Sequence, residues 1–522
     1  MRIGIDVGGT NTDAVLMDGR KVVAEVKTPT TADVTSGVVT ALRNLVGERL
    51  SKPGQVQAVM IGTTHFTNAV VEAKRLMPTA AVRLGLPATQ ALPPMVDWPE
   101  RLRTALGGHV YLCHGGHEFD GRHISELDPD ELRRAAEDIG RKGIRSVAIS
   151  SVFSPVNHEF EEEAGKLLES ELPGVMISLS HEIGRIGLLE RENATIMNAC
   201  LRDLAVHIVD AFHGALAEVG IEAPVYLSQN DGTLMSVDYA QRYPVATFAS
   251  GPTNSMRGAA FLSGRLDCAV VDVGGTTSDV GVLQHGFPRE ASIAVEIGEV
   301  RTNFRMPDVF SFGLGGGSLV RENGELKIGP ESVGYELTSK ALCFGGDTLT
   351  ATDIAVAGGL ADIGDRSRVA GLSPDLVKRS LQLMEDRIAQ AVDRMKTSAG
   401  AIPIVVVGGG SILVRDSLPG ASELVKPEHF AVANAIGAAI AQVGGEVDRI
   451  FSLDKKSRDE TLEEAKREAA EKAVAAGASP GTVHVVDVEE VPLSYLPSNA
   501  TRIRVKAVGE LELEAESVAT GR

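Results

Sequence analysis

Two copies of one short motif combine the residue types that bind phosphate and metal ions. Residues 6–13 read DVGGTNTD and residues 272–279 read DVGGTTSD, so six of eight positions are identical. Paired glycines let the backbone approach phosphate oxygens, which Thr hydroxyls and successive N–H groups can bond. The leading carboxylates, Asp6 and Asp272, suit Mg²⁺, held directly or through water. The residues predicted to contact phosphate are Gly8, Gly9, Thr10 and Asn11 in one copy and Gly274, Gly275, Thr276 and Thr277 in the other.

Each copy lies between two short apolar segments, RIGI and AVLM for the first and CAVV and VGVL for the second. This pattern predicts strand–turn–strand rather than the strand–turn–helix of a dinucleotide-binding motif. One copy alone could be no more than a tight hairpin. Two near-identical copies at the same position favour phosphate binding, and their distance indicates one supersecondary unit repeated in two halves of the molecule.

The remaining chain predicts an α/β protein. Strand and helix patterns alternate from about 109 to 180, a long helical stretch covers 186–219, and an amphipathic helix is expected over 374–397. After residue 450 a charged segment precedes two valine-rich strands. We predict three parts: an N-terminal lobe with the first motif, a second lobe with the second motif, and a small C-terminal α+β appendage, over 1–180, 181–445 and 446–522.

The paired motifs resemble the two phosphate loops of the actin-like superfamily, which includes sugar kinases and Hsp70-type chaperones. This resemblance implies two ribonuclease H-like lobes around a nucleotide cleft that holds ATP and Mg²⁺. It also implies an adenosine-binding glycine loop after a later strand, where VVVGGGS stands at 405–411. A simple strand–helix turn is the alternative there. The residues implied to contact adenosine are Gly408, Gly409, Gly410 and Ser411.

The apolar, Ala-rich segment 430–442 looks like the second interdomain helix of that superfamily. Its small residues would let two helices cross closely; they include Ala435, Gly437, Ala438 and Ala439.

Further segments resemble the hydantoinase/oxoprolinase family, in the same order along nearly the whole chain. They are IGTTHFTNAVVE at 61–72, ERENATIMNACL at 190–201, ASGPTNS at 249–255, FGLGGGS at 312–318 and, more weakly, CFGGDTLTATD at 343–353. The fourth segment is similar to the family's second glycine-rich stretch, which implies nucleotide contacts from Gly315 and Gly316. Together these segments are much more specific than any one of them.

This resemblance implies an ATP-dependent amidohydrolase, or the ATPase subunit of one, that opens a cyclic amide such as a hydantoin, 5-oxoproline or a lactam. A resonance-stabilised amide is a poor electrophile. Phosphorylating its carbonyl oxygen would create a leaving group and activate the carbon toward water. The resemblance also implies a separate B-type subunit and an oligomer, although some members carboxylate ketones instead.

Two other functions stay open. The opening motif also looks like that of some sugar kinases, so a small-molecule kinase is one alternative. The other is a non-catalytic actin-like ATPase that acts as an assembly or activator protein. Turnover of a sugar or ATP-dependent filament formation would reveal these alternatives.

Two polar clusters are candidates for further chemistry. Thr63, Thr64, His65 and Asn68 follow a strand and open a helix, whose N-terminus could bind an anion or an activated carbonyl of the substrate. A helix cap at Thr64 is the alternative. The segment 111–122 holds three possible ligands of a second metal, but HxxH spacing alone favours solvated loop residues. These ligands are His114, His117 and Asp120.

The composition limits the classes of partner that the chain is expected to bind. The formal net charge is −19, and an acidic surface repels nucleic acid and anionic lipid, so neither is expected to bind. No apolar run reaches the roughly 18 residues needed to span a bilayer, and the first residues show no signal-peptide pattern. The four cysteines lie far apart, which favours reduced thiols and a cytoplasmic location.

Overall fold

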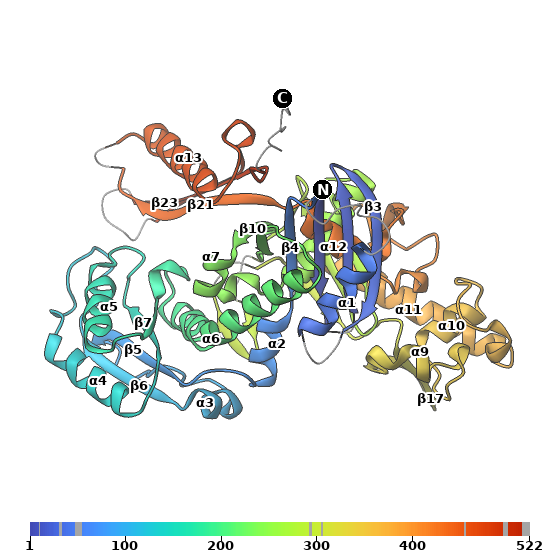
Figure 1. Cartoon of the computed structure of the whole chain (residues 1–522), viewed down its shortest axis with the longest axis horizontal. Helices are drawn as coiled ribbons and strands as arrows, with labels where there is room; N and C mark the ends of the chain where they lie inside the picture. Colours follow the sequence, from blue (N-terminus) through green and yellow to red (C-terminus); the bar gives the residue numbers. More distant parts are fainter. Residues whose placement is uncertain are drawn as a thin grey trace.

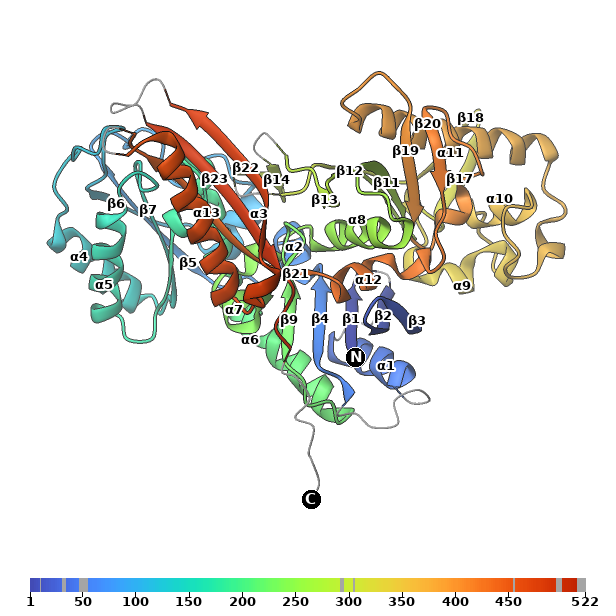
Figure 2. The ribbon, with the colours of Figure 1, turned by 90° about the horizontal axis from the view of Figure 1, so that it is seen from above.

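The computed structural model describes residues 1–9, 11–30, 34–46, 55–291, 295–303, 306–453, 456–493 and 500–513. The larger sheets of the molecule have nine, six and four strands. In Figures 1 and 2 the four-stranded sheet lies at one end of the molecule, the six-stranded sheet lies at the other end, and the nine-stranded sheet lies between them. Each of the two larger sheets contains one copy of the repeated motif.

The nine-stranded sheet contains the first copy of the repeated motif. Its strands in spatial order are β22 (His484–Pro492), β23 (Thr501–Gly509), β21 (Gln442–Phe451), β10 (Thr233–Ser236), β9 (Val225–Ser228), β4 (Ala58–Thr63), β1 (Arg2–Val7), β2 (Asn11–Asp18) and β3 (Lys21–Pro29). The first three strands of the chain form an antiparallel meander, and β4 and β9 follow in parallel. The predicted strand–turn–strand opening is confirmed.

The six-stranded sheet repeats this arrangement around the second copy. Its strands are β13 (Phe287–Pro288), β12 (Ser278–Gln284), β11 (Cys268–Val273), β19 (Ile402–Val407) and β20 (Ala421–Val425), with β16 (Val309–Phe312) also on β12. Here β11 and β12 are antiparallel, and β19 and β20 run parallel to β11. Two short ribbons accompany it: β14 (Val295–Ile297) with β15 (Val300–Thr302), and β17 (Ser318–Asn323) with β18 (Glu325–Ser332).

Helices cover both faces of the strands that carry the motifs. On β1, Ile3 and Ile5 pack in the core shared with α1 (Val34–Val46) and α6 (Leu188–Glu218), while Gly4 faces α12 (Ala433–Ala439). The other helices near these two sheets are α2 (His65–Glu72), α7 (Val237–Arg242), α8 (Ser250–Ser263), α9 (Leu337–Lys340), α10 (Ala351–Ala357), α11 (Pro374–Met395) and α13 (Arg458–Ala475).

Helices α8 and α12 cross between the two large sheets (Figure 2). A Cβ on Gly258 of α8 would lie 1.9 Å from the carbonyl oxygen of Ala433, and one on Gly437 of α12 would lie 1.9 Å from that of Asn254. The predicted close crossing through small residues is therefore confirmed. The α-helix is shorter than 430–442, because a 3₁₀ turn precedes it and β21 begins at Gln442.

The four-stranded sheet is entirely parallel, with the order β6 (His109–His114), β5 (Thr79–Leu86), β7 (Ser146–Ser151) and β8 (Met176–Leu179). Its helices are α3 (Glu100–Leu106), α4 (Pro129–Arg141) and α5 (Glu159–Glu171). A buried ion pair joins this sheet to α6, since Arg83 Nε lies 2.6 Å from Glu192 Oε2 and both side chains are nearly inaccessible.

Sheet pairing crosses both predicted domain boundaries. Strands β9 and β10, from 181–445, and β22 and β23, from 446–522, hydrogen-bond in the same sheet as β1. The C-terminal segment has the predicted α+β composition, with α13 packed on β21 and β23, but its strands extend the first sheet.

Candidate active site

The first motif forms a tight hairpin at the end of β1. The backbone N–H of Gly8 donates to the carbonyl oxygen of Asn11 at 3.0 Å, and the Thr30 hydroxyl donates to the carbonyl oxygen of Gly8 at 2.8 Å. Across the hairpin, Asp6 pairs in register with Asp13, and both carboxylates are buried. The predicted contact at Thr10 lies outside the described residues.

The second motif forms the same hairpin. The backbone N–H of Gly274 donates to the carbonyl oxygen of Thr277 at 2.9 Å, and Asp272 pairs in register with Asp279. The repeat in sequence is thus a repeat in hydrogen bonding and register. It places one carboxylate on each of the two facing strands in both hairpins.

Two other predicted glycine clusters pack against the second hairpin. A Cβ on Gly315 would lie 2.5 Å from the backbone nitrogen of Thr276, and one on Gly408 would lie 2.1 Å from Asp272 Oδ1. Gly408 also has φ of 86°, a conformation that favours glycine. The N–H of Gly316 donates to the carbonyl oxygen of Gly274 at 3.0 Å. These clusters therefore need glycine for close packing around the hairpin.

The rest of the 408–411 loop lies between the two hairpins. The N–H of Gly410 donates to Val273 O at 2.7 Å, and a Cβ on Gly409 would lie 3.5 Å from Lys27 Cε of the first lobe. Ser411 is buried, and its hydroxyl has no hydrogen-bond partner among the described residues. Adenosine contact by this loop stays a prediction.

The crossing helices supply donors to the carboxylates. From α12, Asn434 Nδ2 donates to Asp6 Oδ2 at 2.9 Å and to Asp13 Oδ2 at 3.0 Å. From α8, the Ser255 hydroxyl donates to Asp272 Oδ2. The Lys27 ammonium lies 2.7 Å from Asp13 Oδ1. Each carboxylate pair is therefore held by a side chain from outside its own hairpin.

Four carboxylates and a single ammonium group make the described part of this site strongly negative. Burial, followed by the charge of Asp13, raises the pKa of Asp6 to about 7. Burial likewise raises the pKa of Asp279 to about 6, and it raises the pKa values of Asp13 and Asp272. Asp6 Oδ1 is buried and has no hydrogen-bond partner among the described residues. Excess negative charge and an unpartnered carboxylate oxygen fit a hard divalent cation.

The predicted substrate cluster lies beside the first hairpin. β4 runs parallel to β1, so Thr64 N–H and its hydroxyl both reach the carbonyl oxygen of Val7, each at 3.3 Å. Thr63 Oγ1 lies 2.6 Å from His65 Nδ1, and Asn68 Nδ2 lies 3.5 Å from Thr64 Oγ1. Burial, and then the charge of Arg75, lowers the pKa of His65 to about 4, so its imidazole is neutral at pH 7.

Thr64 occupies the cap position of α2 but makes no side-chain capping hydrogen bond, so the capping alternative does not account for its hydroxyl. The structure thus brings the cluster next to the first hairpin. Its contact with a substrate stays a prediction.

The three residues considered for a second metal do not converge. His114 Nδ1 lies 2.9 Å from Glu131 Oε1, and Asp120 Oδ2 lies 2.7 Å from Arg122 Nε. His117 is fully buried, with its ring 4.6 Å from that of Phe160. The three side chains have separate surroundings because the loop turns sharply at glycines with positive φ, Gly115, Gly116 and Gly121.

Residues 2–172 match the hydantoinase/oxoprolinase N-terminal region, and residues 191–394 match the hydantoinase/oxoprolinase family. The chain belongs to the hydantoinase/oxoprolinase family. The caprolactamase alpha subunit of Pseudomonas jessenii is 26% identical over 476 residues, which are 84% of this chain and 65% of that protein. The acetophenone carboxylase gamma subunit of Aromatoleum aromaticum is 25% identical over 435 residues, 77% of this chain and 58% of that protein. The chain thus spans less than two thirds of either relative.

Two solved structures share the fold. The ATP-dependent caprolactamase from Pseudomonas jessenii aligns with a TM-score of 0.77 at 18% identity, covering 98% of this chain and 88% of that chain. The nucleotide-free acetone carboxylase aligns with a TM-score of 0.66 at 18% identity and the same coverage. The predicted α/β fold class, with its repeated lobes, is confirmed. Among the described helices, none is both long enough and apolar enough to cross a bilayer.

Sequence reasoning missed four residues of this site: Asp13, Asp279, Lys27 and Asn434. The first two close the repeated motif, and a hairpin register would have placed each opposite the leading Asp. Lys27 stands on β3, directly across from Asp13. Asn434 had no comparable signal, because it reaches Asp6 from 428 residues away.

Proposed function

We propose that this chain is the ATP-dependent subunit of an enzyme that opens a cyclic amide, namely a hydantoin, 5-oxoproline or a lactam. The observation that carries the proposal is the pair of register-matched hairpins, whose carboxylates lie at an interlobe crossing. Backbone loops of this kind on two lobes suit a nucleotide's phosphates, gripped from both sides. Membership of the hydantoinase/oxoprolinase family supports the choice of reaction.

The chain's residues divide the work in this proposal. The glycines of both hairpins cradle the phosphate oxygens, and Asp6 and Asp272 hold Mg²⁺, directly or through water. When bound, Mg²⁺ neutralises charge on the transferring phosphoryl group. Asn434 and Ser255 hold the two carboxylates in place by donating to one oxygen of each, so that the other oxygen of Asp6 is left for the metal.

Phosphate transfer to the amide carbonyl oxygen explains the need for ATP. The γ-phosphoryl group moves to that oxygen and ADP leaves. Water then adds to the activated carbon, and the ring C–N bond breaks as the nitrogen takes up a proton, which gives an open-chain amine with an acyl phosphate. A second water releases phosphate and leaves the carboxylic acid.

Thr63, Thr64 and His65 lie beside the first hairpin. With the Thr63 hydroxyl donating to Nδ1 of the neutral His65, the Nε2–H of that ring would donate to the amide carbonyl, and the Thr64 hydroxyl would join it by releasing the carbonyl oxygen of Val7. Asn68, four residues along α2, extends this polar face.

A B-type partner subunit is part of the proposal. The names of the two relatives describe subunits of larger enzymes. A second outcome of the same phosphorylation, carboxylation of a ketone, is favoured by the names of two matched proteins, acetophenone carboxylase and acetone carboxylase.

The test is phosphate release by the purified chain with Mg-ATP, measured with and without a co-expressed B-type subunit. The panel contains hydantoins, 5-oxoproline and lactams, together with ketones plus bicarbonate and a set of sugars. Stimulation by one cyclic amide, with appearance of the ring-opened acid, supports the proposal. Stimulation only by a ketone with bicarbonate, or phosphorylation of a sugar, would replace it with carboxylation or with kinase activity.

A further inference from the structure

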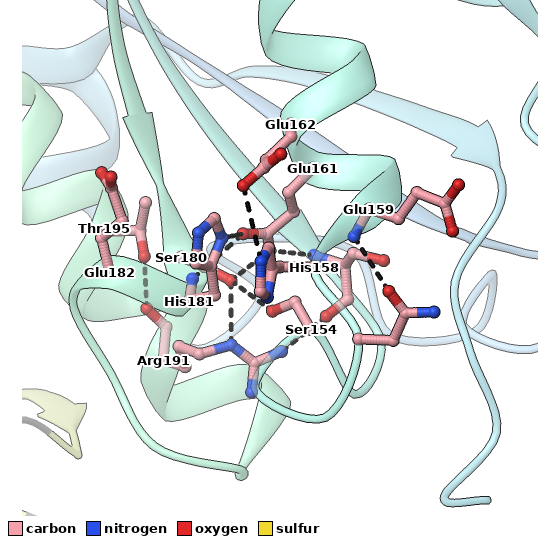
Figure 3. A network of polar contacts seen from close by, with 12 residues as sticks. Ser154, His158, Glu159, Glu161, Glu162, Ser180, His181, Glu182, Arg191 and Thr195 are labelled. Carbon is pink, nitrogen blue, oxygen red and sulfur yellow. Dashed lines mark hydrogen bonds and ion pairs between the residues drawn. The ribbon is translucent and has the colours of Figure 1, made fainter. Parts of the chain in front are cut away.

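A second group of metal-ligating side chains lies far from the hairpins in the fold, on the four-stranded sheet's side of the molecule. His158 and Glu162 belong to the start of α5, and His181 belongs to a 3₁₀ turn, Ser180–Glu182, after β8. One potential ligand atom from each residue lies within 4.8 Å of the other two. Figure 3 shows the three side chains gathered at one place. It is the single such group of three among the described residues.

A buried carboxylate fixes the ring of His181. His181 Nδ1 lies 2.7 Å from Glu161 Oε2, and an ionised carboxylate only accepts hydrogen bonds. Nδ1 therefore carries the hydrogen, and the tautomer suited to a metal has its lone pair on Nε2. A metal-binding histidine characteristically donates its other ring N–H to a carboxylate in this way.

Glu161 is itself held firmly. It accepts from the backbone N–H of Ser151 at 2.7 Å and of His181 at 3.0 Å, and from the Ser180 hydroxyl. These hydrogen bonds fix the carboxylate in position, so that it can keep His181 in one tautomer.

The other two side chains are adjustable. His158 and Glu162 are four residues apart on one helix, so they share a face, and His158 Nε2 lies 3.5 Å from Glu162 Oε1. The His158 side chain is 55% exposed and makes no capping hydrogen bond, while its ring stacks on that of His181 at 4.6 Å. Glu162 has a competing pair with Lys166 Nζ at 3.8 Å, but exposed pairs of this kind are weak.

A metal ion can bind here only if the three side chains move closer together. With metal–nitrogen bonds of about 2.0–2.1 Å, tetrahedral ligand atoms lie about 3.4 Å apart, so ligand atoms now up to 4.8 Å apart must approach by up to about 1.4 Å. Rotation of His158 out of the ring stack supplies this movement, because solvent surrounds most of its side chain. His181, held by Glu161, stays as the fixed point.

We propose that His158, Glu162 and His181 bind one divalent transition-metal ion of the Zn²⁺ class. Two imidazoles and one carboxylate suit Zn²⁺, Co²⁺ or Ni²⁺ rather than Mg²⁺ or Ca²⁺, which prefer oxygen ligands. Both histidines line a pocket of about 560 Å³ that also includes Tyr239 and Tyr243. The two histidines place the site at the pocket wall, and three protein ligands leave a coordination position for a small molecule. The site is independent of the nucleotide hairpins.

The experiment titrates the full chain, stripped with a chelator, with Zn²⁺ by calorimetry and with Co²⁺ by visible absorption. Excess Mg²⁺ is present to occupy the hairpin carboxylates. One equivalent of Zn²⁺ is expected to bind, and Co²⁺ is expected to show ligand-field bands. His158→Ala and Glu162→Gln should each weaken Zn²⁺ binding at least tenfold, and they change exposed side chains, so the fold is retained. Glu161→Gln should weaken binding about 10–100-fold by releasing His181.

The matched control is His207→Ala. His207 Nδ1 lies 3.6 Å from Asp203 Oδ2, an exposed pair with the same four-residue spacing on α6, but this pair is not part of a group of three ligands. Zn²⁺ affinity should be unchanged in this variant. Three results would each overturn the proposal: no Zn²⁺ binding by the unmodified chain, unchanged affinity in His158→Ala and Glu162→Gln, or loss of binding in Asp272→Asn instead.

Discussion

Replacing Asp6 with Asn tests the electrostatics of the candidate site directly. Asp6 is 4% exposed, and burial together with the charge of Asp13 raises its pKa from 3.8 to about 7. Between these two values the folded protein binds more protons than the unfolded chain, so this carboxyl makes the metal-free protein less stable as pH rises. Asn has nearly the same shape as Asp but no charge, so the Asp6→Asn protein should not lose this stability as pH rises.

The size of the effect follows from the pKa. Moving a pKa from 3.8 to about 7 corresponds to about 4 kcal/mol at 25 °C. The free energy of unfolding of Asp6→Asn, minus that of the unmodified chain, should therefore increase by about 3–4 kcal/mol between pH 4 and pH 8 without Mg²⁺. Urea denaturation at a series of pH values measures this difference, because most other titrating groups cancel between the two proteins.

Mg²⁺ supplies the second half of the test. A cation at Asp6 favours the ionised carboxylate, so Mg-ATP should stabilise the unmodified chain at pH 8, by about 2.7 kcal/mol at a hundred times its Kd, and stabilise Asp6→Asn much less. Asp18→Asn is the control, since Asp18 is exposed at the far end of the same hairpin. A difference that stays flat from pH 4 to pH 8, or equal stabilisation of both proteins by Mg-ATP, would refute the reasoning.

Three more predictions follow from single contacts. Asp272→Asn should lower Mg-dependent phosphate release at least a hundredfold, and unchanged release would remove Asp272 from the metal site. Gly258→Ala should lower the free energy of unfolding by about 3 kcal/mol or more, because its Cβ would overlap a carbonyl oxygen of α12, whereas Gly214→Ala on α6 meets no atom within 4 Å and should be neutral or stabilising. Arg83→Met should lower the free energy of unfolding by about 3–5 kcal/mol, because Glu192 would stay buried without its ion-pair partner. A loss under 1 kcal/mol in urea denaturation would contradict this prediction and show that Glu192 becomes hydrated or protonated at little cost in free energy.

The repeated motif made the hairpins predictable because it is local. Strand, turn and strand are specified within eight residues, and the glycines at Gly8 and Gly274 meet the same hydrogen-bonding need in both copies. The family resemblance extended this to the order of the later segments. The predicted boundary after residue 180 had no such support, because β9 pairs with β4 across more than 160 residues of sequence and no local pattern indicates that pairing.

The segment 190–201, which is part of α6, shows where local sequence patterns are insufficient to predict the partners of a side chain. Its charged residues are compatible with a surface ladder or with a substrate-binding face. In the structure Glu192 pairs with Arg83 of β5 and accepts from Ser150 of β7, while Arg191 donates to the backbone of Ser151. These partners come from the four-stranded sheet, and no spacing within the helix indicates them. Both residues anchor that sheet to α6.

The crossing of α8 and α12 connects the fold to the site. Each helix packs on one of the large sheets and provides a donor to that sheet's carboxylates, Asn434 for Asp6 and Ser255 for Asp272. The helices meet through backbone atoms, at Gly258 and at Gly437, which lies against Asn254, the neighbour of Ser255. The absence of side chains at these two contacts therefore determines how closely the two carboxylate pairs approach. Gly437, where an added Cβ would meet the backbone of Asn254, therefore helps to set the distance between the two carboxylate pairs that we propose to hold one metal ion.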